Sequence, residues 1–291
     1  MHYDTIKEHK AYMINGNHPE TSVIMSVYNG EKTLKKAIDS LLGQSYTDYE
    51  LIICDDASTD GTAEILKEYA EKDGRIVLIK HTENKGLGGS LNDCLAKARG
   101  KYIARQDADD ISTPDRLEKT LEYLKSTGAP YVGAGIYVFD DGGVFSKRLF
   151  EEKITKHIIA KKNPFFHPTM IFKKEILDEV GGYRVAEETR RTEDYDLVMR
   201  LAARGYIGQN LQEYLYYVYE PMDAYLRHTR KTRKYEIKTR LHGLKLMKSP
   251  LYDYVYLLKP IIMSLIPHKL YKKLKQIQWG THREEKKNEE V

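Results

Sequence analysis

Residues 101–110, KYIARQDADD, decide how this chain is interpreted, because an apolar run leads directly into a cluster of acids. The run YIA at 102–104 is typical of a buried strand, and Asp107, Asp109 and Asp110 follow it closely. Two carboxylates about 4 Å apart repel each other by about 4 kcal/mol at an effective dielectric constant near 20. A solvated acidic turn gives the same pattern. A cluster at a strand end nevertheless favours a cation site, and its oxygen ligands suit Mg²⁺ or Mn²⁺.

The sequence on both sides of this stretch alternates between strand and helix patterns. Apolar runs at residues 21–27, 51–54, 76–79 and 101–105 are separated by segments with helical spacing at 31–42, at 63–71 and before residue 98. Such alternation predicts a mostly parallel sheet with helices on both faces. In these sheets the ligand site lies outside the carboxyl ends of the strands. Asp55 and Asp56 follow the second run, and Asp107 and Asp109 follow the fourth, so we expect these acids to converge where a nucleotide would bind.

The pattern is less regular after Pro114. Helices are predicted at residues 115–126 and 193–204, strands at 131–139, 169–172 and 214–219, and a turn at 140–143. The fold class expected from the whole pattern is therefore α/β.

The composition is ordinary for a soluble globular protein, with 41% hydrophobic and 31% charged residues among 291. The two cysteines, Cys54 and Cys94, argue against a disulfide scaffold and favour a reducing compartment. Residues 1–20 lack the apolar stretch of a signal peptide. The longest apolar segment, 255–266, is interrupted by Lys259-Pro260, so no transmembrane helix is expected. We therefore expect a cytoplasmic chain.

The net charge of +4 hides an asymmetry between the two ends of the chain. Residues 225–291 carry 17 Lys and Arg against 6 Asp and Glu, a net charge of +11, whereas residues 1–224 carry −7. A basic region of this kind favours phosphate groups. Its mixture of aromatic, aliphatic and basic residues resembles helices that lie on anionic membranes. An ordinary helical cap with a solvated basic face is the alternative, and nucleic acid is not expected because no binding motif for it is present.

Five separated segments resemble the family 2 glycosyltransferases, whose GT-A fold binds nucleotide-diphospho-sugars. They are SVIMSVYNGEKTL, LLGQSYTDYELIICDDASTDGT, NKGLGGSLNDCL, GKYIARQDADDISTPDRLE and TEDYDLVMRLAARGY. The match spans residues 21–219, and the chain is especially similar to enzymes from bacterial exopolysaccharide and biofilm gene clusters. The resemblance implies a GT-A catalytic domain at 21–220.

The expected organisation along the chain follows from this resemblance and from the charge pattern. An N-terminal extension at 1–20 precedes a nucleotide-binding half at 21–110 and an acceptor-binding half at 111–220. A basic, helical, membrane-associating region at 221–280 and a disordered tail at 281–291 then follow.

Four residues are expected near the nucleotide. By resemblance Tyr28 lies beside the uracil ring, which an aromatic face can stack on, although it could instead cap the core. Asp56 is expected to accept a hydrogen bond from uracil, whereas Asp55 binds backbone amides of its own turn. Lys85 lies in a glycine-rich segment that does not fit a dinucleotide-binding motif, and it either contacts the nucleotide or is solvated. Arg105 either reaches the nucleotide or pairs with an aspartate.

The resemblance also assigns a role to each of the remaining acids, either at the metal site or in the transfer reaction. Asp109 is expected to ligate the cation, with Asp107 facing the ribose and contributing secondarily to the metal, and Asp110 serving as scaffolding through a salt bridge or a helix cap. Asp194 is expected to be the general base, which typically contributes 10²–10⁴-fold. Glu193 beside it either assists or favours the helix dipole, and His167 is a core histidine or lies near the phosphates.

The function implied is an inverting, metal-dependent transfer of a hexosyl or N-acetylhexosaminyl unit. The donor would be a UDP-sugar and the acceptor a hydroxyl of a lipid-linked saccharide, at the inner face of the plasma membrane and with other polysaccharide-assembly proteins as possible partners. A glycoside hydrolase would not need these acids at the ends of parallel strands, and a nucleotidyltransferase would show a different loop after the first strand. The remaining alternative is a membrane-bound interaction or regulatory protein built on the same fold.

Overall fold

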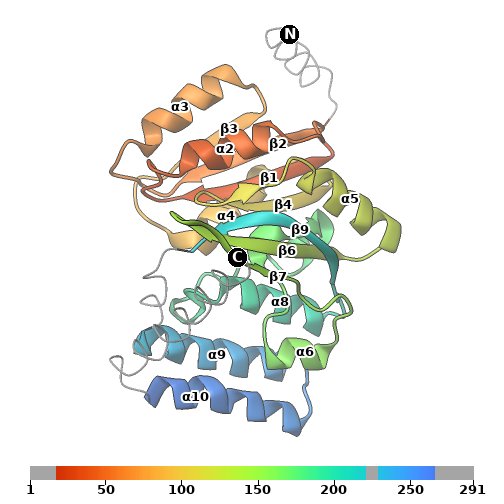
Figure 1. The fold of residues 1–291 in the computed structure, drawn as a ribbon. Helices are drawn as coiled ribbons and strands as arrows, with labels where there is room; N and C mark the ends of the chain where they lie inside the picture. The colour runs from red at the N-terminus through yellow and green to blue at the C-terminus, as the bar shows by residue number, and fades with distance from the viewer. Residues whose placement is uncertain (1–17, 221–228, 266–291) are drawn as a thin grey trace, which may run out of the picture.

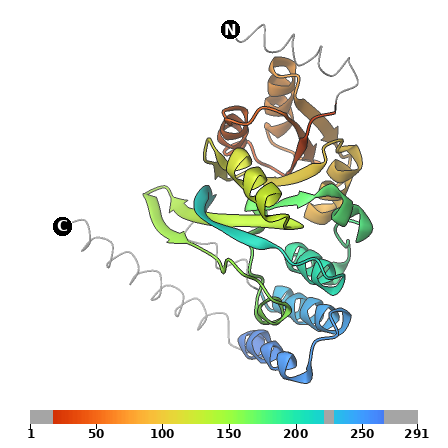
Figure 2. The same cartoon turned by 90° about the vertical axis from the view of Figure 1, so that its right-hand side faces the viewer.

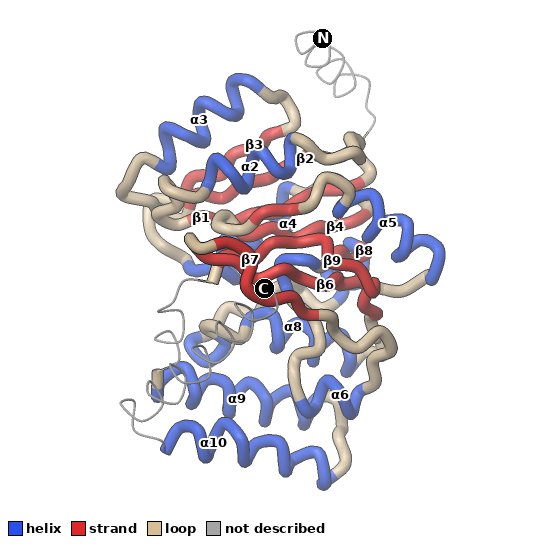
Figure 3. Tube along the Cα trace, viewed as in Figure 1, coloured by secondary structure: helices blue, strands red, loops and turns tan. Residues whose placement is uncertain are grey.

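The computed structural model describes residues 18–220 and 229–265 (Figure 1). Most of the expected N-terminal extension, residues 221–228 and everything after 265, including the expected tail, lie outside the described residues. Strands run through the middle of the molecule, and helices lie above and below them (Figure 3).

The first half of the chain forms the parallel part of the sheet. Its strands are β1 (Thr21–Val27), β2 (Tyr49–Asp55), β3 (Ile76–Lys80) and β4 (Tyr102–Asp107), in the order β3-β2-β1-β4, and its helices are α2 (Leu34–Leu42), α3 (Thr62–Lys72) and α4 (Gly86–Lys97). All of β2 is buried, as expected for a parallel strand that is covered on both faces. The predicted alternation of strands and helices is confirmed here.

Two hydrophobic cores lie on opposite faces of this sheet. One core joins apolar residues of α2, α3 and α5 (Arg116–Thr127) to the sheet, and the other joins α4 and α8 (Glu193–Ala203) to its opposite face. Strand residues alternate between the two, so that Ile52 belongs to one core while Leu51 and Ile53 belong to the other.

The second half of the chain corrects the expectation of a mostly parallel sheet. Its strands are β5 (Ile111–Ser112), β6 (Tyr131–Asp140), β7 (Gly143–Arg148), β8 (Ile171–Lys173) and β9 (Gln209–Tyr219). Only the β6–β9 pairing is parallel; β8 is antiparallel to β4 and β6, β7 to β6, and β5 to β9. The tight turn at 140–143 forces an antiparallel hairpin, because parallel neighbours need a long crossover.

Two strands begin at residues other than those that the sequence predicts. β9 begins at Gln209 rather than at residue 214, because the buried Asn210 donates hydrogen bonds from its amide to the backbone carbonyls of Glu151 (2.8 Å) and Pro164 (3.0 Å). β8 begins later than expected because His167–Thr169 forms a short 3₁₀ turn, η1.

The C-terminal helices pack in layers below the sheet, with α8 next to it, then α9 (Arg230–Leu246) and α10 (Leu258–Leu265) outermost (Figures 1 and 2). α9 lies close to α8, since a Cβ on Gly243 would meet Met199 Sδ at 2.2 Å and Arg240 lies 5.0 Å from the Tyr195 ring centroid. The basic region therefore includes an ordinary helical cap in α9. Among the described helices, none has the length and apolar character needed to cross a bilayer.

Candidate active site

A cleft opens at the carboxyl ends of β1 and β4, as the topology predicts. It encloses about 590 Å³ and is lined by the segment that follows β1, by Asp60, by residues 107–109 and by Tyr219. Tyr28, with 54% of its surface exposed, belongs to this lining together with Asp107 and Asp109. Three of the predicted site residues therefore share one cavity, whereas the other predicted residues lie outside its lining.

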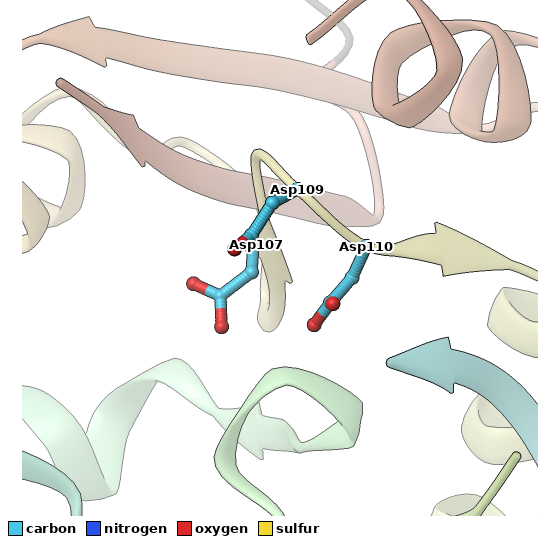
Figure 4. A group of neighbouring side chains, drawn as sticks. All are labelled: Asp107, Asp109 and Asp110. Atoms are coloured by element: carbon cyan, nitrogen blue, oxygen red, sulfur yellow. The ribbon is translucent and has the colours of Figure 1, made fainter. Parts of the chain in front are cut away.

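The acidic cluster lies on the turn between β4 and β5 (Figure 4). One carboxylate oxygen from each of Asp107, Asp109 and Asp110 lies within 4.8 Å of the others, and the Asp107 and Asp110 side chains extend to the same side of the turn. Three acidic oxygen donors at this spacing fit the needs of a hard divalent cation.

Asp110 has a different structural role from the one expected. In place of a salt bridge or a helix cap, its carboxylate accepts a hydrogen bond from the Tyr219 backbone amide at 2.9 Å. Burial and the neighbouring Asp107 and Asp109 raise the pKa of Asp110 well above its ordinary value. Asp110 therefore ties the end of β9 to the acidic turn.

Two buried guanidinium groups hold the end of β4. Arg105 is 1% exposed and forms an ion pair with Asp107, one of the two roles expected for it, while its guanidinium also donates to the Gln106 carbonyl. Arg116 donates to the Arg105 carbonyl at 3.2 Å, and the Asp107 amide donates to the Tyr216 hydroxyl at 3.0 Å. The Asp107 carboxylate is thus fixed through both its backbone and its side chain.

Asp194 lies in the first turn of α8, where Asn163 donates from its side-chain amide to Asp194 Oδ2 at 2.8 Å. The Asn163 side-chain oxygen accepts from the Phe165 amide at 3.2 Å, which fixes the orientation of the amide group. Burial raises the pKa of Asp194, while the Tyr195 amide, Asn163 and the charge of Arg105 act in the opposite direction. The carboxylate is therefore a stronger proton acceptor than an ordinary aspartate.

Tyr183, which the sequence reasoning missed, is a buried residue beside His167. Its hydroxyl lies 2.8 Å from His167 Nε2, and its ionisation is influenced by the charges of Arg105, Asp194 and Asp107. Burial raises the pKa of Tyr183, so the phenol stays neutral. Burial and Arg105 hold the pKa of His167 well below its ordinary value, so this imidazole is neutral too.

The position of Tyr183 is set by the two glycines before it. Gly181 and Gly182 have φ of +72° and +66°, and a Cβ on Gly182 would meet Asn92 Oδ1 at 2.5 Å. Asn92 exchanges two hydrogen bonds of 2.8 Å with the Tyr183 backbone. Two consecutive glycines directly before an aromatic residue were the available sequence signal, because only glycine adopts such φ values freely.

Asp56 is 2% exposed and is largely engaged within the protein. Its carboxylate accepts from His81 Nδ1 and from the Lys85 and Gly86 amides, each at 2.8 Å. Burial alone raises the pKa of Asp56, but these hydrogen bonds bring it below its ordinary value. Asp56 thus anchors the start of α4 to the end of β2, and its contact with uracil stays a prediction.

The neighbouring predicted residues are also held by the protein. Asp55 accepts from the Ser58 amide at 2.9 Å, which confirms its expected tie to its own turn. Lys85 Nζ pairs with Asp93 at 2.8 Å at the half-exposed surface, and a contact of this lysine with the nucleotide stays a prediction. Glu193 lies one residue before Asp194 and close to Gly88, since a Cβ there would meet Glu193 Cγ at 3.6 Å.

Comparison with known proteins identifies the family. The model of "Glycosyl transferase family 2" matches residues 22–181, and that of "Glycosyl transferase family group 2" matches residues 102–271. The chain belongs to glycosyl transferase family 2. It is 45% identical to EpsE of Bacillus subtilis, named "Putative glycosyltransferase EpsE", over 86% of this chain and 90% of EpsE. It is 30% identical to WfaP of Escherichia coli, named as a UDP-Glc:α-D-GlcNAc-diphosphoundecaprenol β-1,3-glucosyltransferase, over 65% of this chain and 72% of WfaP.

Solved structures show that this glycosyltransferase has the GT-A fold. Residues 1–349 of S. aureus TarS in complex with UDP-GlcNAc superimpose with a TM-score of 0.64 at 19% identity, covering 81% of this chain and 72% of that fragment. The mannosyltransferase PcManGT of Pyrobaculum calidifontis, in complex with GDP-Man and Mn²⁺, superimposes with a TM-score of 0.58 at 18% identity, covering 94% and 91% of the two chains. At these identities the likeness concerns the fold.

Proposed function

We propose that this glycosyltransferase transfers a hexosyl or N-acetylhexosaminyl unit from a UDP-sugar to a saccharide hydroxyl, with inversion at the anomeric carbon. The carrying observation is the cleft at the carboxyl ends of β1 and β4, where the exposed ring of Tyr28 and the carboxylates of Asp107 and Asp109 line one cavity. An aromatic face for a nucleobase and oxygen ligands for a metal-bound diphosphate thus line the same cleft.

The exposed ring of Tyr28 supports a nucleotide donor, because it offers the cleft an aromatic face for a base. UDP as the nucleotide is supported by the UDP-GlcNAc complex of TarS and by the UDP-Glc in the name of WfaP. In this proposal Asp56 and Lys85 border the base by fixing the loop before α4, and Arg105 acts through its pairing with Asp107.

A divalent cation, Mn²⁺ or Mg²⁺, fits the acidic turn because the available donors there are carboxylate oxygens within 4.8 Å of one another. Asp109 and, secondarily, Asp107 would hold it, while Asp110 is engaged with β9. When bound, such an ion neutralises charge on a diphosphate. The Mn²⁺ in the PcManGT complex supports this choice.

Asp194 is proposed as the general base. The acceptor oxygen attacks the anomeric carbon as the bond to the UDP oxygen breaks, and Asp194 takes the hydroxyl proton. Because the attack displaces UDP directly, no covalent sugar–enzyme intermediate forms. The buried surroundings that raise the pKa of Asp194 suit this role. The neutral His167 positions the Tyr183 side chain through its contact with the Tyr183 hydroxyl, and Glu193 lies against Gly88.

The acceptor is proposed to be a lipid-linked saccharide, as the name of WfaP supports. The outermost helical layer exposes Leu251 and Val255 on the 3₁₀ helix η4 (Leu251–Leu257) and Leu258 and Ile262 on α10, beside Lys259. We assign this face to the anionic inner surface of the plasma membrane. In this scheme residues 21–110 bind the nucleotide, 111–220 bind the acceptor and 221–280 dock on the membrane, where other polysaccharide-assembly proteins could join.

The test is Asp194→Asn, with Asp178→Asn, at an exposed aspartate that pairs with Lys174, as the matched control. We expect Asp194→Asn to lose at least a hundredfold in transfer, measured as UDP release from a panel of UDP-sugars with and without Mn²⁺. The variant should keep its affinity for UDP in titration calorimetry. Near-normal transfer by Asp194→Asn would reject the assignment of the base.

A further inference from the structure

A continuous row of aromatic side chains lies on the solvent side of β6 and β9. This aromatic stripe consists of Tyr137, Phe139, Tyr214, Tyr217 and Tyr219, all partly exposed. The rings of Tyr137 and Tyr217 are stacked with centroids 4.7 Å apart, and Tyr214 lies 5.1 Å from Tyr137. Phe139 continues the row, at 6.5 Å from Tyr217 and 5.4 Å from Tyr219.

The parallel register of β6 and β9 produces the stripe. Tyr137 is paired with Tyr217 and Phe139 with Tyr219, so that each pair projects from the same face of the sheet. The alternate residues Ile136, Val138 and Tyr216 are buried in a small core on the opposite face. The stripe is therefore the outer surface of this sheet, where the Tyr137 and Tyr217 rings stack on each other and Phe139 meets Tyr217 edge-on.

The stripe is continuous with the cleft. Tyr219 belongs both to the stripe and to the lining of the cleft, and its amide is held by Asp110 on the acidic turn. At about 3.3 Å per residue, the segment from Tyr214 to Tyr219 extends about 17 Å away from this point. A molecule lying along the stripe would have one end at the acidic turn.

Polar groups flank the rings at both ends of the stripe. Lys147 Nζ lies 5.5 Å from the Tyr214 ring centroid, and the Tyr219 hydroxyl donates to Asp141 Oδ1 at 3.1 Å. Ring faces flanked by charged and hydroxyl groups match a ligand that is apolar on its faces and polar around its rim.

We propose that the aromatic stripe binds the saccharide part of the acceptor, with pyranose rings lying along its tyrosines. The C–H groups on a pyranose face pack against the electron-rich face of an aromatic ring, while its rim of hydroxyls meets the flanking charges. This inference rests on the proposed function, because it extends the acceptor path of that site. The stripe holds the chain of sugars, and the terminal hydroxyl reaches the acidic turn beyond Tyr219.

The experiment compares ring-keeping and ring-removing variants of the full chain. The probes are β-1,4-linked oligomers of glucose and of N-acetylglucosamine with one to five units, followed by titration calorimetry and saturation-transfer NMR. We expect the wild-type chain to bind longer oligomers more tightly. The double variant Tyr137→Leu/Tyr217→Leu should bind them at least tenfold more weakly, whereas Tyr137→Phe/Tyr217→Phe stays within about threefold. Tyr206→Leu, on a different surface, is the matched control.

A second measurement separates this inference from the proposed function. UDP affinity with Mn²⁺ should be equal in all these variants, because neither Tyr137 nor Tyr217 lines the cleft. Absence of oligosaccharide binding by the wild-type chain, or equal binding by the leucine variant, overturns the stripe even where UDP binding is intact. Retained oligosaccharide binding without any affinity for UDP overturns the proposed function instead. Thermal melting of each variant checks that it is folded.

Discussion

Replacing Asn163 with alanine removes the hydrogen bond that its amide donates to Asp194 Oδ2 at 2.8 Å. A hydrogen bond to a charged group contributes about 1.5–3 kcal/mol, and this one favours the ionised carboxylate. Its loss raises the pKa of Asp194 further than burial already does. Because a base must be unprotonated to accept a proton, the acid limb of the pH–rate profile moves to higher pH.

The magnitude follows from the same hydrogen bond. Since about 1.4 kcal/mol corresponds to a tenfold change, the rate at a fixed pH on the acid limb should fall by about ten- to a hundredfold. At pH values where Asp194 is fully ionised, the rate should approach that of the wild type. The assay is UDP release under saturating donor, measured across the pH range for both proteins.

The matched control is Gln212→Ala. This side-chain amide donates to the backbone carbonyl of Phe150 at 3.0 Å and not to a carboxylate, so the pH profile of the variant should not move. A profile for Asn163→Ala that superimposes on that of the wild type would refute the role of Asn163. A uniform loss at every pH would show that Asn163 positions the loop without tuning the base.

Three further predictions concern the metal, the helical cap and the membrane face. Asp109→Asn should weaken Mn²⁺-dependent UDP binding by tenfold or more in titration calorimetry, and equal binding would remove Asp109 from the metal site. Gly243→Val should lower the free energy of unfolding in urea by about 1–3 kcal/mol, because its side chain would overlap Met199, and an unchanged value would contradict the packing of α9 on α8. Leu258→Asp/Ile262→Asp should abolish flotation with anionic liposomes but leave UDP binding intact, and equal flotation would argue against the membrane face.

Local patterns predicted the first half of the fold well. In residues 21–107 each apolar run is a strand and each helical pattern a helix, because both faces of a parallel sheet are buried and the runs are almost uninterrupted. The second half was less predictable. The polar start of β9 at Gln209 has no apolar signature, because its hydrogen-bond partners come from segments far away in the sequence. β7 has none because it is an exposed edge strand of the hairpin that it forms with β6.

The candidate site likewise contains residues that the sequence pattern predicted and residues that it did not. Tyr28, Asp107 and Asp109 follow strand ends, and the structure places them in one cleft as the topology predicts. Asn163 and Tyr183 come from loops with irregular patterns, so no periodicity marked them. Asp56 follows the end of β2 as predicted, but its engagement by His81, and that of Lys85 by Asp93, depend on side chains that spacing alone does not bring together.

The sequence by itself determined that acids collect at the carboxyl edge of a parallel sheet, because strand order and apolar runs are local properties of the chain. Only the tertiary structure decided how these acids differ. Asp107 is paired with Arg105, Asp110 is tied to the β9 amide, and Asp194 is desolvated and held by Asn163. The physical reason is that the proton affinity and the accessibility of a carboxylate depend on the groups packed around it, and in this fold most of those groups come from distant parts of the chain.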